Sequence, residues 1–130
     1  MNSQMLKKTM NSLPLWEILV PRQFNSGKPV STRHHQEWDR KVIKLTGGLT
    51  IGSAVKGKWS NDESILFYDG NIPVRLMCSE EIIEEVALMT IEHYRQEAVM
   101  FYLVSSTARV VAASKEQISK FTLIERGEKV

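Results

Sequence analysis

Two segments with apolar residues at helical spacing, each flanked by strand-like segments, constrain the fold of this chain most. The first helix is predicted for residues 33–45, with Ser31 or Thr32 as its N-cap. The second is predicted for residues 80–96, with Ser79 as its cap. Each helix would bury one face, formed by Trp38, Val42 and Leu45 in the first and by Ile83, Val86, Ala87, Thr90, Ile91 and Tyr94 in the second.

Apolar segments around these helices supply the strands. Strands are predicted at residues 15–20, 49–59, 65–68, 72–78, 98–104 and, after a polar break, 110–113. Asp69-Gly70-Asn71 is expected to form a tight turn between two of them. The order β-α-β-β-α-β, with an insertion between the middle strands, predicts an α+β ferredoxin-like fold: an antiparallel sheet with two helices on one face.

Residues 98–104 are continuously apolar, although this strand should lie at a sheet edge. Such a strand needs cover on both faces, and the helices cover only one. Association of copies through the open sheet face is the simplest way to bury the other. We therefore expect a homo-oligomer.

Length and composition set further limits. The 130 residues are 42% hydrophobic and 25% charged, as in an ordinary globular protein. A net charge of +2 is too small to indicate binding to nucleic acid or to an anionic membrane surface. Cys78 is the only cysteine, so no internal disulfide can form, and a cytoplasmic location is expected. We expect a flexible tail at 1–12, the folded domain at 13–113, a loose polar tail at 114–130, and no membrane-spanning segment.

The remaining polar motifs have structural explanations. His34 and His35 are adjacent on a helix and point about 100° apart, and His93 lies on another helix, so no metal site is predicted. No bound cofactor is expected. The acidic residues of the second helix suit its N-terminal end and a solvated face. Glycines such as Gly52 either relax a strand or let a ligand approach the backbone.

Aromatic and charged residues gather around the middle strands. Trp59, Phe67 and Tyr68 lie near Asp69 and Arg75 in the sequence. Aromatic rings beside a carboxylate suit a cationic ligand. Ordinary packing of a hairpin with an aspartate in its turn explains the same residues.

In the order and spacing of several short motifs, residues 15–111 resemble the small S-adenosylmethionine (SAM) lyases encoded by phages. The matching motifs are Ile18-Leu19-Val20, Arg33-His34, Gly52-Ser53, Gly57-Lys58-Trp59, Asp69 before Ile72-Pro73-Val74-Arg75, and Cys78 before the second helix. The family prefers tyrosine where Trp59 stands and glutamate where Asp69 stands. It is similar in architecture to the trimeric PII signalling proteins, whose ligand sites lie between subunits.

The resemblance implies a lyase that splits SAM into methylthioadenosine and homoserine lactone, or that acts on a SAM–AMP conjugate as a CRISPR-linked group does. It implies catalytic roles for Asp69 and Trp59. It implies substrate contacts from Gly52, Ser53, Arg33, His34 and Arg75, in a homotrimer with an adenosyl small molecule as its partner. The alternative is a PII-like module that binds a nucleotide or SAM-type signal without catalysis, which the two departures favour.

Overall fold

A computed structural model describes residues 12–60 and 65–128 of the chain. For residues 57–60 and 65–69 it describes the backbone alone. The chain divides into a larger unit, Leu13–Ala108, and a smaller unit made of Met1–Ser12 and Arg109–Val130. Most of the predicted N-terminal tail lies outside the described residues. The predicted domain boundaries stay a prediction.

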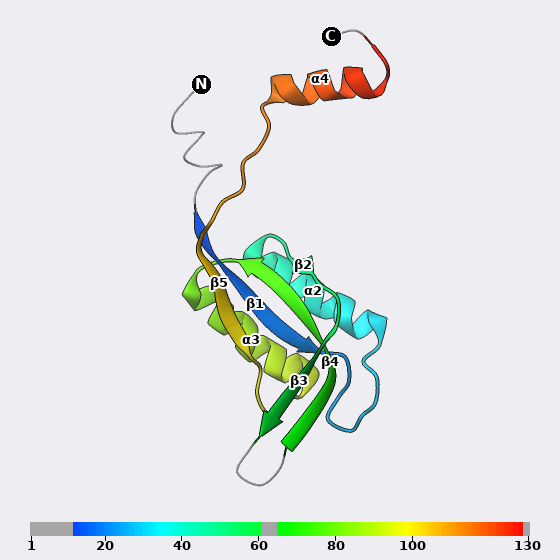
Figure 1. The fold of residues 1–130 in the computed structure, drawn as a ribbon, viewed down its shortest axis with the longest axis vertical. Coiled ribbons are helices and arrows are strands. Elements are labelled where there is room, and N and C mark those ends of the chain that lie inside the picture. The colour runs from blue at the N-terminus through cyan, green and yellow to red at the C-terminus, as the bar shows by residue number, and fades with distance from the viewer. Residues whose placement is uncertain (1–11, 61–64, 129–130) are drawn as a thin grey trace. The chain divides into compact units, whose positions relative to one another are not determined.

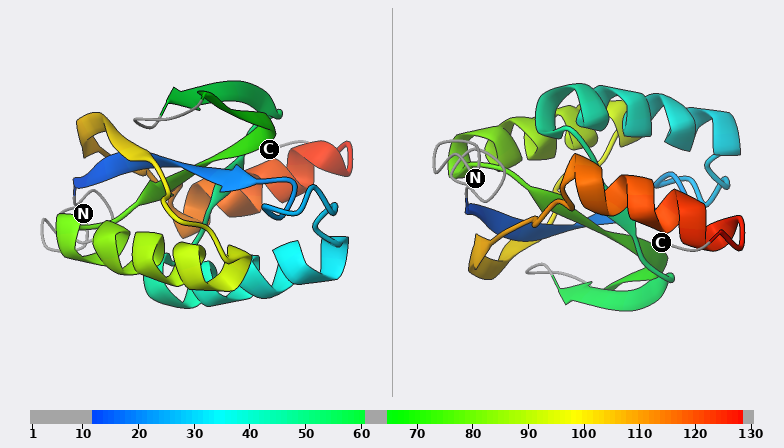
Figure 2. Two further views of the ribbon diagram at one scale, coloured as in Figure 1. Left: turned by 90° about the horizontal axis from the view of Figure 1, so that it is seen from below. Right: turned by 90° about the horizontal axis from the view of Figure 1, so that it is seen from above.

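The larger unit is an antiparallel sheet with two helices on one face (Figures 1 and 2). The strands follow the order β2-β4-β1-β5, and β3 also pairs with β4. This arrangement confirms the predicted ferredoxin-like α+β fold. The elements are β1 (Leu13–Pro21), α2 (Thr32–Thr46), β2 (Thr50–Ile51), β3 (Val55–Ser60), β4 (Ile65–Met77), α3 (Glu80–Tyr94) and β5 (Phe101–Ala108).

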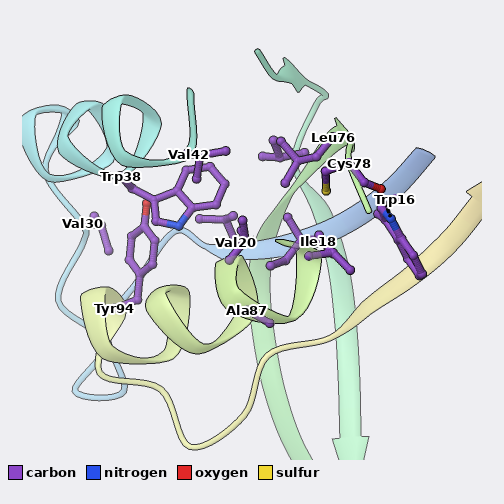
Figure 3. Packing of buried hydrophobic residues seen from close by; sticks show 13 residues of the cluster. Trp16, Ile18, Val20, Val30, Trp38, Val42, Leu76, Cys78, Ala87 and Tyr94 are labelled. Carbon is purple, nitrogen blue, oxygen red and sulfur yellow. Dashed lines mark hydrogen bonds between the residues drawn. The ribbon is translucent and has the colours of Figure 1, made fainter. Parts of the chain in front are cut away.

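The core lies between the sheet and the two helices, as Figure 3 shows. Alternate residues of β1 face it, and Trp16, Ile18 and Val20 are all buried. Trp16 lies opposite Leu76 of β4, and Ile18 opposite Val74. Because side chains alternate between the two faces of a strand, this register brings the apolar sides of both central strands against α2 and α3.

Local side-chain chemistry sets the helix ends. The Ser31 hydroxyl accepts a hydrogen bond from the His34 N–H at 3.1 Å, and the Ser79 hydroxyl accepts one from the Ile82 N–H at 3.3 Å. Both serines therefore satisfy N–H groups that the first helical turn leaves free. Helix α2 ends at Gly47, whose φ of 86° is a left-handed conformation that glycine adopts without strain.

The middle of the chain differs from the prediction. Asp69-Gly70-Asn71 does not form a turn but lies within the continuous strand β4. Asn71 pairs with Pro21 of β1 and with Val55 of β3, so backbone pairing on both sides keeps the segment extended. The predicted strand at 49–59 is two strands, β2 and β3, interrupted at Gly52. In Figure 2 the β3–β4 hairpin curls toward the sheet face that lacks helices.

The last strand begins and ends later than predicted, at Phe101 and Ala108, and residues 110–113 are not a strand. Its predicted position at a sheet edge is correct. Tyr102, Leu103 and Val104 are exposed, at 40%, 49% and 37%, which agrees with the expectation that this edge lacks cover within one chain. The homo-oligomer itself stays a prediction.

The smaller unit contains a helix, α4 (Lys115–Glu125), where the sequence analysis expected a loose tail. Ser114 and Gln117 form a capping box in which each side chain accepts a hydrogen bond from the other's backbone N–H. This local pairing starts the helix, so part of the segment predicted as a loose polar tail is helical. The position of the tail outside the folded domain stays a prediction. None of the helices in residues 12–60 and 65–128 is long and apolar enough to cross a membrane.

Candidate functional site

A cavity of about 380 Å³ lies where three segments of the larger unit meet. The loop after β1 contributes to it, as do the segment around the start of β3 and one position of β4. The lining residues are Arg22, Gln23, Pro29, Ala54, Val55, Lys56 and Gly70.

Backbone hydrogen bonds hold the loop after β1 against β4. The Arg22 N–H donates to the Gly70 carbonyl at 3.0 Å, and the Arg22 carbonyl accepts from the Val30 N–H at 2.9 Å. Gly70 has a φ of 82°, and a Cβ atom there would lie 2.7 Å from Cδ of Arg22. Glycine at this position therefore allows both the left-handed backbone and the passage of the Arg22 side chain beside the strand.

Two cationic residues, Arg22 and Lys56, line the cavity. Arg22 and Lys56 are both exposed, and none of the lining residues that the structure describes is acidic. Asn71 follows Gly70 in β4 and is only 6% exposed. Its Nδ2 has no hydrogen-bond partner among the described residues. A buried amide donor without a partner is costly, and Asn71 is not among the residues that line the cavity.

Of the site residues that the resemblance implied, two are next to a lining residue of this cavity in the sequence. Gly52 and Ser53 precede the lining residue Ala54. Gly52 donates its N–H to the Pro73 carbonyl at 2.8 Å, and a Cβ on Gly52 would lie 3.0 Å from Cγ of Pro73. The glycine is therefore explained by close approach to β4, whereas Ser53 is exposed.

The two residues expected to be catalytic lie on the strands of the β3–β4 hairpin. The backbone of Trp59 belongs to β3, and Asp69 directly precedes the lining residue Gly70 in β4. Their side chains lie outside the described part of the chain. Their proposed roles stay predictions.

The structure does not bring the other three predicted residues to the cavity within one chain. The Arg75 guanidinium pairs with the Glu17 carboxylate at 3.1 Å across β4 and β1. Arg33 pairs with Glu37 at 3.7 Å on the exposed side of α2. His34 stacks on His93 of α3.

Arg22 and Lys56 were not among the residues predicted for the site. Both lie in segments without a recognisable motif, 34 positions apart in the chain. The only sequence signal was the position of Arg22 directly after Pro21, beyond the end of the first predicted strand, whereas Lys56 lay inside the strand predicted at 49–59. The register that brings the loop after β1 and the start of β3 to the same part of β4 was needed to find them.

No protein-family model matches the sequence, and no curated protein matches it. Among solved structures, a phage SAM lyase in complex with S-methyl-5'-thioadenosine is similar, with a TM-score of 0.54 at 11% identity over 77% of this chain and 90% of its own. CutA1 from Oryza sativa has a TM-score of 0.52 at 6% identity over 93% of this chain and 97% of its own. CutA1, a divalent cation tolerance protein, from Thermus thermophilus has a TM-score of 0.51 at 7% identity over 82% of this chain and 91% of its own.

These comparisons define the class of fold. The chain has the ferredoxin-like fold that the CutA1 proteins share with the phage SAM lyase. At such low identity the likeness extends to the fold alone.

Proposed function

We propose that this chain binds an adenosyl ligand in the cavity and cleaves it as a SAM-type lyase, with a SAM–AMP conjugate as the preferred substrate. The observation that carries the proposal is that Arg22 and Lys56 both line one cavity, and that Gly52 and Ser53 directly precede its lining residue Ala54 in the sequence. The phage SAM lyase of similar fold is described in complex with S-methyl-5'-thioadenosine, an adenosyl compound.

The charge of the cavity favours the conjugate over SAM itself. SAM has a sulfonium and an ammonium against a single carboxylate, so two cationic side chains would repel more of it than they attract. An AMP moiety adds a phosphate, and arginine and lysine are the side chains that bind phosphate best.

The reaction needs no nucleophile from the protein. The carboxylate oxygen of the substrate attacks its own γ-carbon, the bond from that carbon to sulfur breaks, and the electron pair neutralises the sulfonium. The protein must fold the methionine arm and exclude water. Arg22 and Lys56 would bind the phosphate and not the attacking carboxylate, because a cation bound to that carboxylate would make it a weaker nucleophile. Asp69 would hold the α-ammonium, and Trp59 would pack against the sulfonium.

Arg33 and Arg75 would reach the ligand only from a neighbouring subunit, so the proposal includes a homotrimer built on the sheet face without helices. His34 is held against His93 of the same chain and is left out of the proposed site. On this face Glu17 lies between Arg75 and Tyr102 on the neighbouring strands, with half-buried Leu15 and Leu19 on the same side of β1. We expect light scattering of the purified chain at micromolar concentration to give a trimeric mass. A monomeric mass would contradict the shared site.

The decisive experiment offers SAM and the SAM–AMP conjugate separately to the purified chain and separates the products by chromatography. We expect methylthioadenosine or its AMP conjugate, together with homoserine lactone, and faster turnover of the conjugate. Asp69→Asn keeps the side chain's shape but removes its charge. A lost charged hydrogen bond costs about 1.5–3 kcal/mol, which corresponds to roughly tenfold to a hundredfold slower turnover at an unchanged melting temperature. Unaltered turnover in that variant would exclude Asp69 as the ammonium contact.

The second candidate function is a PII-like module that binds a nucleotide or SAM-type signal without catalysis. Trp59 and Asp69 favour it, because they replace the tyrosine and glutamate that the lyase family prefers. In this case calorimetry would show binding and chromatography would recover the ligand unchanged. If the chain neither binds nor cleaves either ligand, both proposed functions are excluded and only the fold assignment stands. The cytoplasmic location stays a prediction.

A further inference from the structure

Two histidines join α2 to α3 through paired contacts. The imidazole rings of His34 and His93 stack with their centroids 3.9 Å apart and their planes 23° from parallel. The His34 Nε2 lies 2.7 Å from the His93 carbonyl oxygen, and the His93 Nε2 lies 2.8 Å from the His34 carbonyl oxygen. Each ring is thus fixed by the backbone of the other helix.

These contacts determine which ring nitrogens remain free. A carbonyl oxygen only accepts hydrogen bonds, so each Nε2 must carry a proton and donate. In the neutral rings, each Nδ1 then keeps its lone pair. Histidines that bind metals usually donate their other N–H in this way to a carbonyl or carboxylate, which fixes the tautomer and the orientation of the ring.

A carboxylate and an ammonium lie next to the pair. Glu37 follows His34 by nearly one turn of α2, and ligand atoms of His34, Glu37 and His93 lie within 4.8 Å of one another. The Lys41 Nζ lies 3.4 Å from the His93 Nδ1, in position to donate to its lone pair. The Lys41 ammonium therefore lies where a metal cation would bind, beside the His93 Nδ1 lone pair and near the Glu37 carboxylate.

We propose that His34, Glu37 and His93 form a binding site for a divalent transition metal ion such as Zn²⁺, which displaces the Lys41 ammonium. Two imidazoles and a carboxylate are ligands that suit Zn²⁺, whereas Mg²⁺ and Ca²⁺ prefer oxygen ligands alone. Ligand atoms about 2.1 Å from a tetrahedral ion lie about 3.4 Å apart, so ligand atoms as far as 4.8 Å apart must close by up to about 1.4 Å. The two rings, which lie 23° from parallel, must also turn so that both Nδ1 lone pairs point at the ion. The fourth position would remain for water.

None of these three residues lines the cavity, so the metal site is separate from the proposed lyase site. The sequence predicted no metal site because adjacent His34 and His35 point about 100° apart on one helix. His35 is instead engaged by the Tyr94 hydroxyl, which lies 2.7 Å from its Nδ1. The partner of His34 is 59 positions further along the chain, on another helix.

The test titrates the full-length chain, first freed of metal with a chelator, with Zn²⁺ in competition with a chromophoric zinc indicator. We expect one Zn²⁺ per chain and a higher melting temperature in its presence. Glu37→Gln should weaken binding at least tenfold, because it replaces an anionic ligand without removing the histidine contacts between the helices. Lys41→Met should strengthen binding several-fold, because it removes the competing ammonium.

His35→Ala is the matched control, since it removes a histidine of the same helix without touching the three ligands, and its zinc affinity should stay within twofold of wild type. His93→Ala should lose the site. If that variant fails to fold, Glu37→Gln and Lys41→Met decide, because both residues lie toward solvent. No binding in wild type would overturn the proposal. Affinities of Glu37→Gln and Lys41→Met equal to that of wild type would overturn it as well and leave the histidine pair as a contact between helices only.

Discussion

Replacing Trp38 with alanine is expected to lower the free energy of unfolding of the larger unit by about 3–5 kcal/mol. The Trp38 side chain is 1% exposed and fills the space between α2 and α3, beside Tyr94 (Figure 3). Its Nε1 donates a hydrogen bond to the Thr90 hydroxyl at 2.9 Å, and that hydroxyl donates to the Val86 carbonyl at 2.6 Å. The substitution therefore leaves a large cavity and removes a buried hydrogen bond. Urea denaturation followed by circular dichroism measures the loss.

Trp38→Phe separates the two contributions. Phenylalanine retains most of the buried ring but cannot donate to Thr90, so we expect a smaller loss, nearer to about 1–2 kcal/mol. Equal losses in the two variants would mean that the hydrogen bond, and not the packing volume, accounts for the effect. A loss below about 1 kcal/mol in Trp38→Ala would contradict the central packing position that the structure gives this side chain.

The helices of the larger unit were predictable because their signals are local. Ser31 and Ser79 stand at the cap positions, and the apolar stripe through Trp38 and Val42 gives the buried face of α2. Sequence and structure agree within about two residues at these ends. The strand predicted at 15–20 corresponds to β1, where Trp16, Ile18 and Val20 form the buried side of an alternating pattern.

The middle strands were less predictable, because tertiary pairing overrides a local signal there. Asp69-Gly70-Asn71 has the composition of a tight turn, yet Asn71 is held in β4 by Pro21 on one side and Val55 on the other. Gly70 suggested the turn, but in the structure its missing side chain leaves space for the side chain of Arg22. A pattern of adjacent residues cannot report a contact between segments nearly 50 positions apart.

The candidate sites depend on the same kind of information. His34 and His93 each looked like solvated residues of separate helices, and only the packing of α2 against α3 brings their rings together. Arg22 and Lys56 become a pair only when the loop after β1 and the start of β3 meet at β4. Residue types could be read from the sequence, but their convergence required the topology.

Removal of both cations from the cavity should separate the two possible substrates. We expect the double variant Arg22→Met, Lys56→Met to bind the SAM–AMP conjugate roughly a hundredfold or more weakly than wild type. Each lost charged hydrogen bond to phosphate costs about 1.5–3 kcal/mol. SAM lacks the phosphate, so its affinity should fall by less than tenfold or rise slightly as repulsion is relieved. Calorimetry with each ligand measures both changes.

Arg22 and Lys56 are both exposed, so the melting temperature of the double variant should stay near that of wild type. Lys44→Met is the matched control, because Lys44 is an exposed cation of α2 outside the cavity lining. Its loss changes the net charge without changing the proposed phosphate contacts, so affinity for the conjugate should stay within about twofold. An equal loss of affinity in the control would assign the effect to long-range charge. Equal losses for SAM and the conjugate in the double variant would show that Arg22 and Lys56 do not contact the phosphate, and the cavity would then have to bind the part common to both ligands.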